Sequence, residues 1–205
     1  MTSHDKKFLY IILLMLWVST AFAQERIQVG DYVQNTEVRD SKNNPVMLPY
    51  FGEKTIMIFY SDPDRPNRNE YLAERLKQEE LNGDDFYGFG VVNLKDAPFF
   101  PNGLVRFMIR REEKKNAKHN VKIYTDPDHL LKNAWNFGDV NDQFAVSVIS
   151  KEGEVLFYQE KELTENETED FIVWLRDYLG VNDDEGEEEI IIIEEEVIEI
   201  VTNDD

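Results

Sequence analysis

The chain has 205 residues, no cysteine, 42 acidic and 22 basic side chains, and a formal net charge of −20 at pH 7. This charge argues against a nucleic-acid-binding protein, because phosphate contacts need clustered lysine and arginine. The lack of cysteine excludes a disulfide framework and thiol chemistry in this chain, so its hydrophobic core alone must hold the domain together.

Residues 1–23 are expected to be a cleavable signal peptide. Two lysines precede an apolar run at 8–18, and the small residues Ala21 and Ala23 offer a cleavage site. The run is short for a bilayer span, which favours cleavage over the alternative of an uncleaved N-terminal anchor. The sequence therefore predicts export and a mature chain that begins at Gln24 and has no stable membrane insertion.

The core of the chain, residues 24–180, is long enough for a single domain. Near its start, the polar turn at 40–45 separates Val38 from the apolar segment 46–48, and this pattern predicts a small hairpin. The run 55–60 is apolar and β-branched almost throughout, which is typical of a strand buried on both faces of a sheet.

The rest of the core is expected to contain both helices and strands. The expected elements are a helix at 68–81, a strand at 86–94, a helix from 104, a short strand at 121–124, a short helix ending at 135, and strands at 144–149 and 154–159. In the helix from 104, Leu104, Phe107 and Met108 are expected to face inward. The two strands after residue 143 are expected to form an antiparallel hairpin.

The last helix carries the clearest signals in the sequence. Thr164 and Glu167 form a capping box at its start, and Gly180 stands where the chain leaves the helix. The order of elements is then a βαβ unit followed by a ββα unit. This order predicts an α/β protein with a thioredoxin-like mixed sheet, helices on both faces of the sheet, and an N-terminal hairpin extension.

The turn after the first inner strand is where this fold places its reactive group, because the following helix offers free N–H donors and a positive partial charge. Thioredoxins have Cys-x-x-Cys there and peroxiredoxins a single cysteine, whereas residues 61–68 read Ser-Asp-Pro-Asp-Arg-Pro-Asn-Arg. Thioredoxins also carry a proline before their third inner strand, where residues 141–143 are Asn-Asp-Gln. Both positions exclude the redox chemistry of the fold.

The same turn offers four candidate ligand-binding residues, Asp62, Asp64, Arg65 and Arg68. The arginines lie near a helix N-terminus, where they could hold a carboxylate or a phosphate, or could instead neutralise the two aspartates. The aspartates suit a hard cation but lack the spacing of a calcium loop. Because Asp-Pro-Asp recurs at 126–128, helix capping is the favoured interpretation of both tripeptides.

No residue pattern predicts an enzyme. Ser61 has no histidine or lysine in a nucleophile motif, and no glycine-rich loop is present to cradle a phosphate. His119 and His129 lack a second ligand at metal-binding spacing and are interpreted as surface residues. We therefore expect no catalytic residue, no metal and no cofactor.

Residues 181–205 form an acidic tail. From 183 to the end there are twelve acidic residues and no basic one, so the tail carries more than half of the net charge. A solvated, self-repelling segment is the favoured interpretation. Its isoleucine and valine clusters at 190–201 leave open a strand added to a sheet edge, and its charge leaves open cation binding.

Residues 89–97, the phenylalanine- and proline-containing loop after them, and residues 146–155 resemble the YtfJ-type proteins. These are small periplasmic proteins of Gram-negative bacteria with a signal peptide and a thioredoxin-like core. The resemblance covers most of 27–179 and leaves the tail outside. It implies a periplasmic location and the same fold, and it supplies no catalytic residues.

These observations together favour a non-enzymatic binding or adaptor module of the bacterial periplasm, with an unidentified protein as its partner and no nucleic acid. One alternative is an acidic cation-binding protein in which the tail is the functional part. The other is a small-ligand site at the former active-site loop, formed by Asp62, Asp64, Arg65 and Arg68.

Overall fold

The computed structural model describes residues 26–65, 68–96, 101–117 and 121–181, so the expected signal peptide and nearly all of the acidic tail lie outside the described residues. The elements are β1 (Glu37–Arg39), β2 (Pro45–Met47), β3 (Thr55–Ser61), α2 (Glu70–Glu79), β4 (Phe86–Asn93), α3 (Asn102–Lys115), β5 (Ile123–Asp126), α4 (Leu130–Ala134), β6 (Phe144–Ile149), β7 (Val155–Glu160) and α5 (Glu165–Leu179). No helix within the described ranges is both long and apolar enough to cross a membrane.

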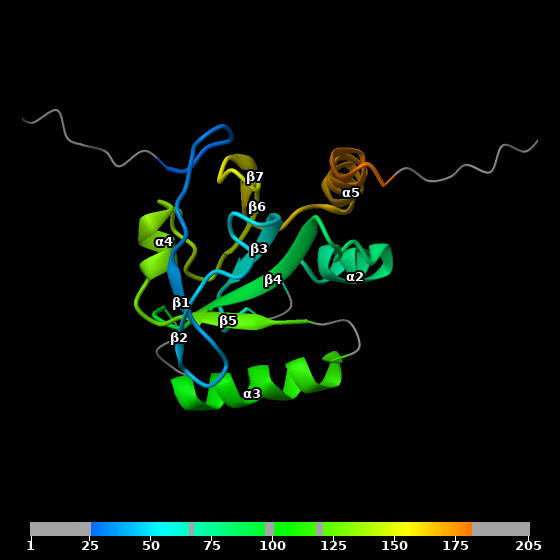
Figure 1. Ribbon diagram of the computed structural model, residues 1–205. Coiled ribbons are helices and arrows are strands. Elements are labelled where there is room, and N and C mark those ends of the chain that lie inside the picture. Colours follow the sequence, from blue (N-terminus) through cyan, green and yellow to red (C-terminus); the bar gives the residue numbers. More distant parts are fainter. Residues whose placement is uncertain (1–25, 66–67, 97–100, 118–120, 182–205) are drawn as a thin grey trace, which may run out of the picture.

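A seven-stranded mixed sheet runs through the molecule in the order β2-β1-β5-β4-β3-β6-β7 (Figure 1). The parallel strands β5, β4 and β3 form one half, and β6 and β7 join as an antiparallel hairpin beside β3. On the other edge, β1 and β2 form the expected N-terminal hairpin, and β1 pairs with β5. The strand expected at 55–60 is thus central, as its continuous apolar sequence predicts.

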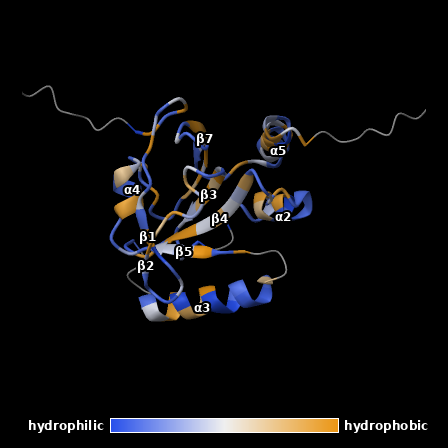
Figure 2. Ribbon diagram, in the orientation of Figure 1, coloured by the Kyte–Doolittle hydropathy of each residue, from blue (hydrophilic) through white to orange (hydrophobic). Residues whose placement is uncertain are grey.

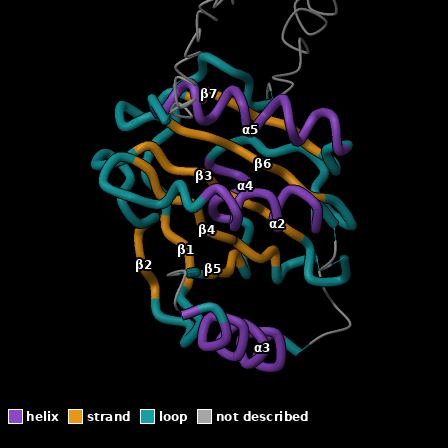
Figure 3. Tube along the Cα trace, turned by 90° about the vertical axis from the view of Figure 1, so that its right-hand side faces the viewer, coloured by secondary structure: helices purple, strands orange, loops and turns teal. Residues whose placement is uncertain are grey.

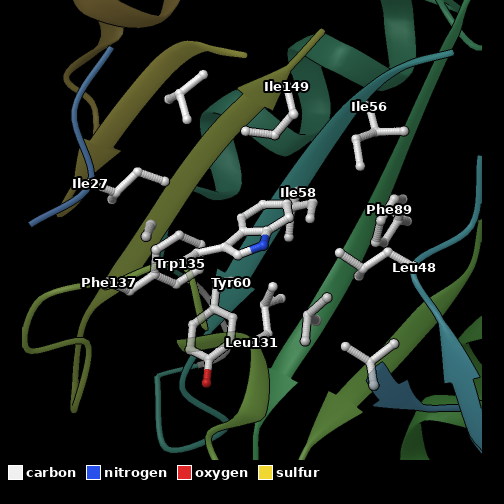
Figure 4. Close-up of a cluster of buried hydrophobic side chains, with 14 of the residues drawn as sticks. Ile27, Leu48, Ile56, Ile58, Tyr60, Phe89, Leu131, Trp135, Phe137 and Ile149 are labelled. Atoms are coloured by element: carbon white, nitrogen blue, oxygen red, sulfur yellow. The ribbon is translucent and has the colours of Figure 1, made fainter. Parts of the chain in front are cut away.

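Helices cover both faces of the sheet, as expected (Figure 3). On one face, α2 and α5 pack Leu72, Phe171 and Leu175 against Met57 of β3. On the other face, α4 and the N-terminal segment enclose a second cluster around Trp135, shown in Figure 4. Because side chains alternate along a strand, one central strand supplies both clusters.

The prediction of which residues of α3 face inward is wrong. Leu104, Phe107 and Met108 are 46%, 57% and 58% exposed, whereas Val105 and Ile109 are buried. Hydrophobic and hydrophilic residues lie side by side along this helix (Figure 2). The sequence has two adjacent apolar stripes, and the narrower i, i+4 stripe is the one that contacts Leu94 and its neighbours in the third core cluster.

The last helix matches its sequence signals. The Thr164 hydroxyl accepts a hydrogen bond from the Glu167 N–H at 3.3 Å, and the Glu167 carboxylate accepts one from the Thr164 N–H at 2.7 Å. Gly180 follows the helix with φ of 67°, the left-handed region that glycine tolerates. The capping box and the C-terminal stop are confirmed.

An ion pair joins α2 to α5 over the sheet. Arg75 donates from Nε and Nη2 to the two carboxylate oxygens of Glu169 at 2.8 and 3.0 Å, and the Tyr71 hydroxyl donates to the same carboxylate at 2.7 Å. These hydrogen bonds, first from Arg75 and then from Tyr71, lower the pKa of Glu169 from 4.5 to about 2. The carboxylate therefore stays charged in the folded protein at pH values where it is protonated in the unfolded chain.

We expect this pair to give the protein a measurable acid sensitivity. A carboxyl whose folded-state pKa is depressed stabilises the protein above its unfolded-state pKa, and that contribution disappears as the pH falls toward 2. Glu169→Gln and Arg75→Met should both flatten the fall in stability below about pH 4.5, measured by urea unfolding at a series of pH values. A fall in stability as steep in both variants as in the wild type would contradict the assignment.

Candidate functional site

Polar side chains gather at the edge of the sheet where the parallel strands end. Asp62 follows β3, Asn93 ends β4 and Asp126 ends β5, and each is at most 1% exposed. In α/β sheets of this kind ligands bind outside the carboxyl ends of the strands. This edge is therefore the candidate site. It includes Asp62, the first of the four candidate residues in the loop after β3.

Asp62 is held inside the loop and does not cap a helix. Its Oδ1 accepts the Asp64 N–H at 2.8 Å and its Oδ2 accepts the Asp142 N–H at 2.9 Å. Burial raises the pKa of the Asp62 carboxyl, an effect that these two N–H groups oppose and the nearby charges of Asp64 and Asp142 reinforce. The carboxylate thus ties the loop after β3 to the loop before β6.

Two of the other three candidates contact the same loop before β6. Arg65 pairs with Asp142, its Nε 3.1 Å from Oδ1, in an exposed contact. Arg68 donates to the Gln143 side-chain oxygen at 3.4 Å. Asp64 has a buried oxygen, Oδ1, with no partner among the described residues. Asp62, Arg65 and Arg68 therefore all contact Asp142 or Gln143 in the loop before β6. In the described part of the chain, neither arginine pairs with Asp62 or Asp64.

Asp126 caps α4 from the end of β5 and not as its N-cap residue, which is His129. The Asp126 carboxylate accepts the N–H groups of Leu130, Leu131 and Lys132 at 2.7, 3.1 and 3.2 Å, which are the free donors at the start of α4. It also accepts the Tyr60 hydroxyl at 3.1 Å. Burial, together with the charge of Asp126, raises the pKa of Tyr60, so the tyrosine stays a hydrogen-bond donor.

The first helix of the site shows no such cap. α2 begins at Glu70, eight residues after Asp62, and the side chain of its N-cap residue, Asn69, does not cap the first turn. The Glu162 carboxylate accepts the Asn69 backbone N–H at 3.4 Å. The Asn69 side chain lies at this end, 2% exposed. Its Oδ1 accepts the Leu163 N–H at 2.7 Å, whereas its Nδ2 has no partner in the described part of the chain.

A histidine that sequence reasoning placed at the surface belongs to the site. The Nε2 of His129 lies 3.0 Å from both the Asn93 Oδ1 and the Asp96 Oδ2, and it donates because both partners are acceptors. Burial pushes the pKa of Asp96 upward, but the hydrogen bond from Asn93 and the positive charges of His129 and Lys132 outweigh this and hold that pKa below its usual value. His119 lies outside the described residues.

No signal in the sequence links these residues, because His129 is 33 positions from Asp96 and 36 from Asn93. Only the parallel pairing of β4 with β5 brings the two strand ends together. Within the described ranges, no three histidine, aspartate or glutamate side chains are grouped so that they could hold a metal ion. At this edge the carboxylate oxygens of Asp62 and Asp126 are already supplied with donors, whereas the Asp64 Oδ1 has no partner among the described residues.

Comparisons with known proteins agree with this architecture. A model of a bacterial protein family of unknown function, YtfJ_HI0045, matches residues 62–178. No curated protein matches the chain. Among solved structures, a putative protein disulfide isomerase from Bacteroides thetaiotaomicron superposes with a TM-score of 0.54 at 16% identity, over 75% of this chain and 91% of that one.

Two further structures support the same fold. A peroxiredoxin-like protein from Aquifex aeolicus has a TM-score of 0.51 at 15% identity, over 74% of this chain and 89% of that one. An exposed lipoprotein thioredoxin from Streptococcus pneumoniae has a TM-score of 0.50 at 15% identity, over 70% of this chain and 99% of that one. At such identities the likeness concerns the fold alone, and the expected thioredoxin-like fold is confirmed.

Proposed function

Because this chain belongs to the YtfJ_HI0045 family of bacterial proteins and has a thioredoxin-like fold without a cysteine, we propose that it is an exported, non-enzymatic binding or adaptor module of the periplasm. The proposal rests mainly on the residue that stands in the loop after β3. Asp62 stands there buried, with both carboxylate oxygens bonded to backbone N–H groups. A carboxylate held in this way cannot replace the thiolate that attacks a disulfide or a peroxide.

The outer face of α3 supports a protein as the partner. Leu104, Phe107 and Met108 lie at i, i+3 and i+4, so they form one contiguous apolar patch, and each is about half exposed. Patches of large apolar side chains with arginine nearby are typical of interaction sites. Arg111 and Glu112 follow in the next turn, so the partner is a protein with an apolar groove and a polar rim.

The test is capture of periplasmic proteins on the immobilised mature protein. We expect a partner that the wild type retains and that Phe107→Asp loses. The matched control is Val173→Asp, because Val173 is 59% exposed on α5, against 57% for Phe107 on α3. Disulfide reductase and peroxidase assays on the same preparation should stay at background.

Two results would contradict the proposal. One is reductase or peroxidase activity clearly above that of a heat-inactivated sample. The other is a set of captured proteins that is the same for the wild type, Phe107→Asp and Val173→Asp, since binding through α3 requires that only the first substitution disrupts it. The N-terminal residue of the protein recovered from the periplasm tests export separately, and the expected residue is Gln24.

A further inference from the structure

A groove of about 790 Å³ runs along the sheet beside α2. Its floor is the face of β3 and β4 that carries Met57, Phe59, Gly88 and Gly90, and α2 and the residues around Ile123 at the start of β5 form its sides. Figure 3 shows α2 and β5 on either side of β4. A volume of this size is within the usual range for small-molecule sites.

The two glycines keep the floor of the groove low. A Cβ at Gly88 would approach the Met57 methyl carbon to 3.1 Å, and one at Gly90 would contact Ile123 at 3.7 Å. The glycines add no side chains of their own, so the Met57 and Ile123 side chains lie over them and form the floor on which an extended ligand can rest. Along β3 the groove is lined by Met57, Phe59 and Ser61, a length of about 13 Å, and it continues past the start of the strand to Lys54.

One end of the groove presents hydrogen-bond donors. Ser61, Arg68 and Asn69 line it where β3 ends. Asn69 is 2% exposed, and its Nδ2 has no partner within the described ranges. The first turn of α2, which the Asn69 side chain does not cap, begins at the next residue and adds the positive end of a helix dipole. The Glu162 carboxylate accepts the Asn69 backbone N–H at 3.4 Å, which leaves the Asn69 Nδ2 and Arg68 for a ligand. A guanidinium, an unpaired amide N–H and a helix N-terminus together favour an anionic group.

Large apolar side chains line much of the rest of the groove, together with the charged residues Lys54, Lys77, Glu80, Asp84 and Lys122. Leu76 and Leu81 line it from the side of α2, and Phe59 and Phe144 line it from the sheet. The groove thus offers donors for an anionic head at one end and apolar side chains beyond it. These features match an aliphatic carboxylate. We propose that this groove binds a free long-chain fatty acid, with its carboxylate at Arg68 and Asn69 and its alkyl chain along Gly88 and Gly90.

This assignment is independent of the partner proposed for the outer face of α3, because the exposed residues of that patch do not line the groove. It also differs from a site made by the whole loop after β3, since Asp62, Asp64 and Arg65 are not part of the lining. Each acidic side chain of that loop would repel a carboxylate, and the groove places its polar end at Arg68, beyond them.

The test is a titration of the mature protein with hexadecanoate below its micelle concentration, followed by displacement of a fluorescent fatty acid. We expect saturable binding of one molecule per chain. Octanoate should bind at least about a hundredfold more weakly, because eight methylene groups fewer are buried. Hexadecylamine and the zwitterionic lysophosphatidylcholine should also bind more weakly, since both present a cation to Arg68.

Three variants locate the ligand. Arg68→Met should weaken hexadecanoate binding about tenfold or more, the value of a charge-assisted hydrogen bond. Asn69→Asp keeps the acceptor for the Leu163 N–H and replaces the unpaired donor with a negative charge, so it should weaken hexadecanoate and strengthen hexadecylamine. Gly90→Val should abolish binding of both by filling the floor. Arg26→Met removes an equal charge from an exposed position outside the lining and should leave binding unchanged.

The proposal fails if hexadecanoate does not bind, or if it binds no more tightly than octanoate. It also fails if Arg68→Met and Asn69→Asp bind hexadecanoate as the wild type does, because the carboxylate then lies elsewhere. Thermal melts of each variant accompany the titrations. If Gly90→Val does not fold, the negative charge introduced by Asn69→Asp decides alone, since only a ligand head at that position changes its preference from hexadecanoate to hexadecylamine.

Discussion

Trp135→Ala is expected to lower the free energy of unfolding by about 4 kcal/mol, the usual cost of deleting a large aromatic side chain from a core. Trp135 is 1% exposed and packs against Phe137 at a ring separation of 6.0 Å and against Phe51 at 6.3 Å. Its Nε1 also donates to the Gln34 carbonyl at 2.9 Å, which fixes the N-terminal segment over α4. Figure 4 shows the indole between β3 and the segment that follows α4.

Denaturant unfolding followed by circular dichroism measures this cost, and Trp135→Phe separates packing from the hydrogen bond. The phenylalanine variant keeps most of the apolar contact but lacks the donor to the Gln34 carbonyl, so it should cost less than half as much. Trp174 provides the matched control: it lies half-buried on α5, in contact with Phe157 and Phe171. Trp174→Ala should be less damaging than Trp135→Ala, and an equal or larger loss would contradict this reading of the core.

The parts of the fold that depend on local pattern follow from the sequence. The continuous apolar run of β3 predicts a central strand, and the capping box at Thr164 and the glycine at position 180 predict both ends of α5. These signals are local because they arise from backbone hydrogen bonding within a few residues. Strand β5 is displaced by two residues from its expected range, since pairing with β4 and not composition decides where it begins.

The candidate site is less accessible to such reasoning. Asp62 and Asp126 open the same tripeptide, yet only Asp126 caps a helix, because α4 begins four residues after it and α2 begins eight residues after Asp62. The partner of Asp62 is the Asp142 N–H, 80 positions away, and the partner of Asn69 is the Leu163 N–H, 94 positions away. Contacts between residues so far apart in the sequence depend on the order of the strands in the sheet. Local sequence patterns do not reveal that order.

The exposed stripe on α3 shows the same limit in another form. Leu104, Phe107 and Met108 have the spacing of a buried helix face, and the sequence offers no reason to prefer Val105 and Ile109. The choice is made by the small area of sheet that α3 covers, where Val92 and Ile123 accept only a narrow apolar ridge. The three residues that the sequence pattern assigned to the core therefore form the surface on which we propose that a partner binds.

Asp126→Ala is expected to cost about 3 kcal/mol of stability, which corresponds to a loss of about 10 °C in melting temperature for a domain of this size. Asp126 is 1% exposed and accepts four hydrogen bonds, three from α4 and one from the Tyr60 hydroxyl. Alanine leaves these donors buried without an acceptor, and each such donor costs about 1–3 kcal/mol unless water reaches it.

The sequence provides a matched control two residues away. Asp128 is the second aspartate of the same tripeptide, and its side chain is exposed, so Asp128→Ala should change the melting temperature by little more than about 1 °C. Asp126→Asn retains one acceptor oxygen but presents an N–H₂ group to donors, and it should fall between the two. Thermal unfolding of the three variants measures the series. If Asp128→Ala proved as costly as Asp126→Ala, the stabilisation would come from the local turn. The hydrogen bonds that join β3, β5 and α4 through Asp126 would then not be what stabilises this edge of the sheet.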